Sequence, residues 1–121
     1  MGSIDKNPAP AESEVNTFLE YVNFRLPDGF MDFYKVANGA FINTEENYLH
    51  LWPLTEMVQL NVDYAVDEFA PTFFAFGSNG GDTCYLVERA TGFVFEMPFI
   101  GMAEDEATFV DSNFSNFLKS F

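Results

Sequence analysis

The sequence predicts an α+β fold, in which helices back one antiparallel or mixed sheet of about four to six strands. Apolar residues recur with helical spacing in the first third and at the end of the chain. Between them, residues 72–98 hold short apolar runs joined by turn residues, as in strands linked by hairpins. The length of 121 residues and the hydrophobic content of 48% suit one hydrophobic core.

The chain is expected to begin with a mobile tail, residues 1–12, followed by a single domain, residues 13–121. The tail holds two prolines and one glycine and almost no bulky apolar residue. Ser13 is suited to cap a first helix. That helix should end near Arg25, because Pro27 disfavours helical geometry at the residue before it. Its apolar stripe consists of Val15, Phe18, Leu19 and Val22.

A second helix is expected over about residues 28–37. Asp28 lies where a carboxylate stabilises the start of a helix. Gly39 should end the helix, because glycine adopts the left-handed conformation at little cost. The apolar stripe of this helix consists of Phe30, Phe33, Tyr34 and Ala37.

The middle of the chain predicts a strand, a helix and an irregular acidic segment. Residues 48–52 alternate, with Leu49 and Leu51 on one face and Tyr48, His50 and Trp52 on the other. Residues 40–42 are a candidate short strand before it. Residues 55–64 have the spacing of a third helix, and residues 63–71 are acidic and without a regular pattern.

The second half predicts three strands and a closing helix. The strands are expected at residues 72–77, 83–88 and 93–97, with a loop at 78–82 and a hairpin turn at 89–92. The run Glu104, Asp105 and Glu106 is expected to be a solvated loop, and a last helix follows Asp111 or Ser112. The core is expected to bring together Phe33, Tyr34, Phe74, Phe76, Phe95, Phe117 and Leu118.

The charge balance points to a basic partner. Five Lys and Arg against nineteen Asp and Glu give a net charge of −14, which repels nucleic acid and anionic membranes and attracts a basic protein surface. No apolar run is long enough to span a membrane, and the first residues lack the pattern of a secretory signal. One cysteine excludes a disulfide framework. We therefore expect a cytoplasmic protein; solubility alone is the other explanation of the acidity.

The sequence shows no catalytic, metal or cofactor site. His50 is the only histidine, and no local signature pairs it with a nucleophile. Cys84 lies in an expected strand and is interpreted as an inert core residue. One His and one Cys would need two carboxylates to complete a zinc site. The glycine-rich segment 77–81 lacks the Lys-Ser/Thr of a phosphate-binding loop and is interpreted as turn chemistry.

Motifs along these elements resemble, in order, those of the SUKH superfamily, which includes yeast Smi/Knr cell-wall regulators and many bacterial immunity proteins. They cover about residues 15–121, at 26–30, 33–34, 38–40, 51–57, 74–81, 91–95 and 111–118. The chain departs from the pattern at Ala40, where the family has Gly, and at Val110 and Asn113 in the closing motif. The resemblance implies an α+β fold with a helix-backed sheet and no general catalytic signature.

The resemblance and the charge together predict a non-enzymatic binding protein. We expect an immunity protein that neutralises a cognate toxin, perhaps a nuclease, by direct contact through an acidic surface. The alternative is an intracellular regulator or scaffold that binds an endogenous protein. An enzyme of unrecognised type is a third possibility. The expected partner-binding residues are Glu45, Glu46, Tyr48, Trp52, Asp63, Asp67, Glu68, Glu104, Asp105 and Glu106. Tyr48 and Trp52 would act as aromatic anchors if their strand face is exposed; otherwise helices cover that face.

Overall fold

The computed structural model describes residues 3–121, which form a seven-stranded sheet, five α-helices and one short 3-10 helix. The elements in chain order are β1 (Ser3–Lys6), α1 (Glu12–Tyr21), α2 (Phe30–Tyr34), β2 (Ala40–Asn43), β3 (Tyr48–Leu51), α3 (Leu54–Asp63), α4 (Val66–Phe69), β4 (Phe73–Ser78), β5 (Thr83–Glu88), β6 (Val94–Pro98), η1 (Glu104–Glu106), β7 (Thr108–Asp111) and α5 (Phe114–Lys119). The α+β prediction is confirmed, but the sheet is larger than expected.

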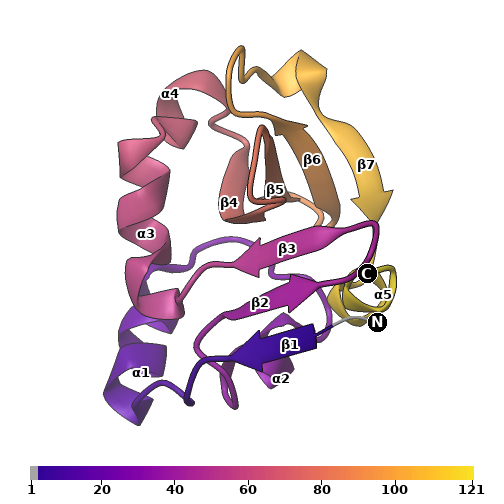
Figure 1. The fold of residues 1–121 in the computed structure, drawn as a ribbon. Helices are drawn as coiled ribbons and strands as arrows, with labels where there is room; N and C mark the ends of the chain where they lie inside the picture. Colours follow the sequence, from indigo (N-terminus) through magenta and orange to yellow (C-terminus); the bar gives the residue numbers. More distant parts are fainter. Residues whose placement is uncertain (1–2) are drawn as a thin grey trace.

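The sheet is a meander in which every strand pairs antiparallel with its neighbour in sequence. Figure 1 shows β1, β2 and β3 as one group in the lower part of the view and β4 to β7 as another above them. Between the two groups, His50 pairs with Ser78 and Leu51 pairs with Gly77, and the Trp52 N–H donates to the Phe76 carbonyl at 3.0 Å. The sheet therefore opens between β3 and β4 beyond these contacts.

The main core lies on the face of the sheet that carries Phe74 and Phe76. Both side chains are fully buried. Phe74 packs on Phe18 of α1, with ring centroids 6.2 Å apart. Phe76 packs edge-on against Phe114 and Phe117 of α5, at 5.6 and 5.7 Å. Neighbouring residues of a strand point to opposite faces, so Phe73 lies on the other face, where its ring is 5.3 Å from Phe95.

The expected core is confirmed in part. Tyr34, Phe74, Phe76 and Phe117 are fully buried in one hydrophobic cluster. Phe33, Phe95 and Leu118 are only partly buried against that cluster. Phe95 pairs with Leu86, opposite Ala75, and therefore belongs to the second face of the sheet.

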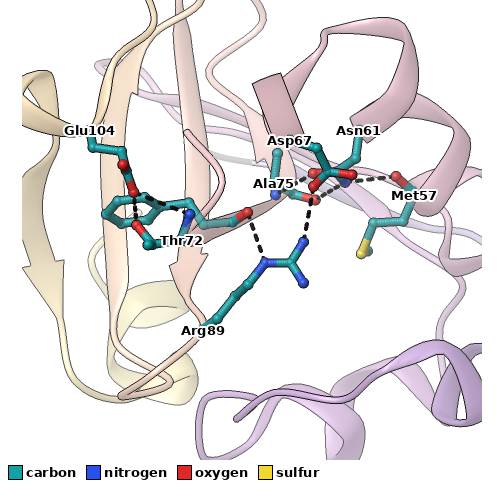
Figure 2. Close-up of polar contacts among 8 residues, drawn as sticks. Met57, Asn61, Asp67, Thr72, Ala75, Arg89 and Glu104 are labelled. Carbon is teal, nitrogen blue, oxygen red and sulfur yellow. Dashed lines mark hydrogen bonds and ion pairs between the residues drawn. The ribbon is translucent and has the colours of Figure 1, made fainter. Parts of the chain in front are cut away.

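Asn61 closes the opening between β3 and β4. Its amide oxygen accepts a hydrogen bond from the Ala75 N–H, and its amide nitrogen donates to the Ala75 carbonyl, both at 2.8 Å (Figure 2). The same nitrogen donates to the Met57 carbonyl one turn earlier in α3, also at 2.8 Å. Only 3% of Asn61 is exposed. A side chain of α3 thus takes the place of a neighbouring strand at Ala75.

The prediction of a mobile tail is wrong for its described residues. Ser3–Lys6 forms β1, paired with β2, and the Asn7 N–H donates to the Gly39 carbonyl at 3.1 Å. Composition did not reveal this strand because all four of its residues are exposed and backbone hydrogen bonds hold it in place. Strand β7 was missed for a similar reason, since none of its residues is buried. Residues 1–2 lie outside the described residues.

Helix ends differ from the predictions in ways that local contacts explain. Helix α1 begins at Glu12, because the Glu14 carboxylate accepts a hydrogen bond from the Ala11 N–H at 2.7 Å. It ends at Tyr21, short of Arg25. Helix α2 is a shorter element than the expected 28–37. The predicted helix stop at Gly39 is wrong, because α2 already ends at Tyr34. Gly39 does adopt the left-handed conformation, with a φ of +88°, and a Cβ there would lie 2.5 Å from the Leu51 carbonyl oxygen.

Replacing Asn61 tests the closure of the sheet. We expect Asn61→Leu to lower the free energy of unfolding by about 2–5 kcal/mol, because it leaves the buried N–H and C=O of Ala75 without partners. Gln59→Leu is the matched control on the same helix, where the amide is exposed; it should change stability by at most about 0.5 kcal/mol. Urea unfolding of both variants measures the difference. Equal stabilities would show that Asn61 does not hold α3 to β4.

Candidate functional site

The predicted acidic residues are exposed and lie on four elements. Glu45 and Glu46 are in the turn between β2 and β3, and Asp63 ends α3. Asp67 and Glu68 are in α4, and Glu104, Asp105 and Glu106 form η1. In Figure 1 the β2–β3 turn and α4 lie on opposite sides of the molecule. The structure therefore distributes these carboxylates over more than one surface.

Two of the predicted carboxylates are held by neighbouring groups near the start of β4. Asp67 forms an ion pair with Arg89 at 3.3 Å. The Glu104 carboxylate accepts hydrogen bonds from the Thr72 hydroxyl and from the Thr72 N–H, the latter at 3.1 Å. The backbone N–H of Arg89 donates to the Thr72 carbonyl at 2.9 Å. Residues of α4, η1 and the turn after β5 therefore meet at this point (Figure 2).

Arg89 is engaged within the fold. Its Nε donates to the Phe73 carbonyl at 3.2 Å, and its guanidinium lies 4.7 Å from the centre of the Phe24 ring. The side chain is 23% exposed. These contacts hold one of the five basic side chains against the core. The carboxylates around it remain exposed.

Other predicted carboxylates line two hollows of the surface. Glu45 and Glu46 line one of about 370 Å³, together with Tyr85 and Phe121. Glu106 lines another of about 270 Å³, where Asp82 and Glu96 are also present. Sequence reasoning did not single out Asp82 and Glu96, because they lie far from Glu106 along the chain.

The two predicted aromatic anchors have different environments. Tyr48 is half-buried, and its ring packs on Gly80, where a Cβ would lie 2.5 Å from a ring carbon. Trp52 is only 3% exposed and stacks on Tyr64, with centroids 5.7 Å apart. Of the two alternatives for this strand face, the covered one holds at Trp52, where the ring of Tyr64, after α3, stacks on it.

The face of β3 that carries His50 borders a hollow of about 450 Å³. His50 stacks on Phe41 of β2, with centroids 4.3 Å apart and the planes 12° from parallel. Ser78 lies opposite His50 in the β3–β4 pair, and its hydroxyl accepts a hydrogen bond from the Gly80 N–H at 3.2 Å. The β3–α3 hollow, as we call it, is lined by Asn7, Phe41, His50, Trp52, Pro53, Glu56, Leu60, Tyr64 and Ser78.

Burial sets the protonation of His50 and Cys84. Desolvation lowers the pKa of His50 below its ordinary value of 6.5, and the Glu56 carboxylate acts in the opposite direction. Burial also raises the pKa of the Cys84 thiol far above its ordinary range, so the thiol stays protonated at neutral pH. Among residues 3–121, no three His, Cys, Asp or Glu side chains are grouped to hold a metal ion. No helix of this part of the chain could cross a bilayer.

One family model, that of the SMI1/KNR4 family (SUKH-1), matches residues 9–120. The chain belongs to the SMI1/KNR4 family. This confirms the resemblance that the motifs indicated. Strand β1 precedes the residues matched to the SMI1/KNR4 family. No curated protein sequence matches this one.

The lowered pKa of His50 predicts a pH-dependent stability. A group whose pKa is lower in the folded state takes up its proton more readily in the unfolded chain, so the fold loses stability as the pH falls below about 6.5. His50→Phe removes this effect. We expect the free energy of unfolding of the variant, minus that of the parent, to rise as the pH falls from about 8 to about 5. Urea unfolding across this range measures it; a difference that stays constant or falls contradicts the assignment.

The buried Cys84 thiol should resist alkylation. We expect iodoacetamide at mildly alkaline pH to leave the folded protein unmodified, because the thiol is covered and protonated. The unfolded protein in urea should gain a single label, since the chain has one cysteine. Mass spectrometry of both samples reads out the result. Rapid labelling of the folded protein would show that Cys84 is accessible.

Proposed function

We propose that this SMI1/KNR4 family member is a non-enzymatic binding protein of the immunity type, which acts in the cytoplasm. In this proposal it neutralises a cognate toxin by direct contact. Its acidic surface meets a basic groove on the toxin, of the kind that a nuclease uses for nucleic acid, and occludes it. The toxin is inferred from the family, and the basic character of the partner is inferred from the charge of this chain.

The observation that carries the proposal is the exposed negative charge, which extends over more than one face of the molecule. The chain has a net charge of −14, and the eight predicted partner-binding carboxylates are all exposed. Such a surface steers a basic protein toward it and repels nucleic acid and acidic proteins. Asp67 and Glu104 are moreover held in position by Arg89 and Thr72, which supports a fixed charge pattern rather than a flexible one.

The contacts of the reactive side chains also support a binding role. The Cys84 thiol is buried and protonated, which disfavours it as a nucleophile. The imidazole of His50 stacks on Phe41, while the neighbouring Ser78 hydroxyl accepts a hydrogen bond from Gly80. We therefore assign these side chains to packing and not to catalysis.

The partner should be identified first, by affinity capture from the source cell and mass spectrometry, and then studied by stopped-flow kinetics. We expect the association rate constant to fall at least about tenfold between low and high salt, while the dissociation rate changes less, because salt screens charge steering. A salt-independent association rate would contradict the acidic-surface mechanism. Capture of an endogenous regulatory protein in place of a toxin would favour the alternative role.

Charge reversal on η1 locates the interacting surface. We expect the double change Asp105→Lys and Glu106→Lys to slow association with the captured partner severalfold. Glu104 is left unchanged because it holds Thr72. The control is Glu20→Lys with Asp32→Lys, two exposed carboxylates of α1 and α2, which alters the net charge by the same amount. Equal slowing by both variants would show that net charge acts without a defined surface.

A further inference from the structure

The β3–α3 hollow combines two stacked aromatic pairs with one carboxylate. Phe41 and His50 form one pair, and Trp52 and Tyr64 form the other, with their planes 12° and 15° from parallel. The pairs come from different elements: β2 and β3 supply the first, and the residues flanking α3 supply the second. Both line one hollow of about 450 Å³. Figure 1 shows α3 beginning shortly after the end of β3.

The electrostatics of the hollow favour a cation. Glu56 is the one Asp, Glu, Lys or Arg among the lining residues. Its charge also acts on His50. Because burial lowers the pKa of His50, the imidazole is neutral near neutral pH and does not repel a positive group. Aromatic rings attract a cation through their negative faces, and a planar guanidinium stacks on them.

The other hollows do not share this combination. One of about 490 Å³ between α1 and α3 is lined by Glu14, but that carboxylate caps the Ala11 N–H. The hollow beside the β2–β3 turn has Glu45 and Glu46, but its rings meet other rings tilted or edge-on: Tyr48 lies at 46° to Phe41, and Tyr85 at 65° to Phe117.

We propose that the β3–α3 hollow binds an arginine side chain of the protein partner, with the guanidinium held between the aromatic pairs and next to the Glu56 carboxylate. This inference rests on the proposed function for the identity of the partner as a basic protein. Trp52 and Ser78, which are 3% and 8% exposed, form the floor. Tyr64 and Phe41, which are 45% and 38% exposed, form the accessible walls.

Trp52 reports on binding, because it is the only tryptophan of the chain. The probes are N-acetyl-arginine amide, its uncharged isostere N-acetyl-citrulline amide, and N-acetyl-lysine amide. We expect a saturable change of Trp52 fluorescence with the arginine probe at millimolar concentrations and none with the citrulline probe. The lysine probe should bind more weakly, because its ammonium group cannot stack as a plane.

Variants of exposed residues link the signal to the hollow. We expect Glu56→Gln to weaken binding of the arginine probe about five- to tenfold and Tyr64→Leu to weaken it by a similar factor. Glu20→Gln on α1 is the control for loss of an exposed carboxylate elsewhere, and it should leave the affinity unchanged. Urea unfolding confirms that each variant is folded.

The outcomes separate this inference from the proposed function. An equal response to arginine and citrulline, tighter binding of lysine, or unchanged affinity in Glu56→Gln would overturn the arginine site. If the arginine probe fails while partner association remains salt-dependent, the hollow is not the site but the acidic-surface mechanism stands. If the probe binds as expected while partner association is independent of salt, the hollow stands and the acidic-surface mechanism fails.

Discussion

The hydrogen bonds between Asn61 and Ala75 are the constraint on which the arrangement of this sheet depends. Strand β3 pairs with β4 at only two residues, and one more hydrogen bond joins the Trp52 N–H to the Phe76 carbonyl. Beyond this point the buried backbone groups of Ala75 would lack partners. The amide of Asn61 has one acceptor and two donor hydrogens, so it matches both backbone groups and still reaches Met57. Asn61 thus supplies from a helix the hydrogen bonds that a neighbouring strand would give to Ala75. Residues of β3, α3 and β4 together line the β3–α3 hollow.

The aromatic content explains how so small a chain tolerates an opened sheet. Phe76 contacts Phe30, Phe114 and Phe117, all of them in helices and at ring distances of 5.6–6.0 Å. These contacts tie α2 and α5 to the middle of the sheet on the face opposite Phe73. Rings buried in this way supply large apolar area and favourable edge-to-face geometry. The central strands are thus held by packing where they lack a full set of strand neighbours.

Sequence patterns predicted the parts of this fold that depend on local chemistry. Strand β5 was placed at Thr83–Glu88, and the left-handed backbone at Gly39 and the loop before Thr83 follow from glycine and asparagine chemistry. Strands β1 and β7 escaped prediction because none of their side chains is fully buried. The β3–α3 hollow was not predicted for two reasons. In the sequence, Asn61 looks like an ordinary polar residue of a helix. Glu56 and Tyr64 approach His50 only through tertiary packing. Of the predicted site, exposure of the carboxylates follows from their charge, whereas the burial of Trp52 depends on Tyr64.

The acidic surface and the β3–α3 hollow would act on different rates: the acidic surface on association with the partner, and the hollow on dissociation. Exposed carboxylates such as Asp105 and Glu106 act over about 10 Å at moderate salt, which raises the rate of encounter without selecting one orientation. Most differences in affinity between related complexes arise in dissociation, which depends on close, desolvated contacts. A hollow with Trp52 at its floor and Glu56 beside it provides such a contact for a single side chain. Opposite charge therefore brings a basic partner to this protein, and one arginine in the hollow fixes how it docks.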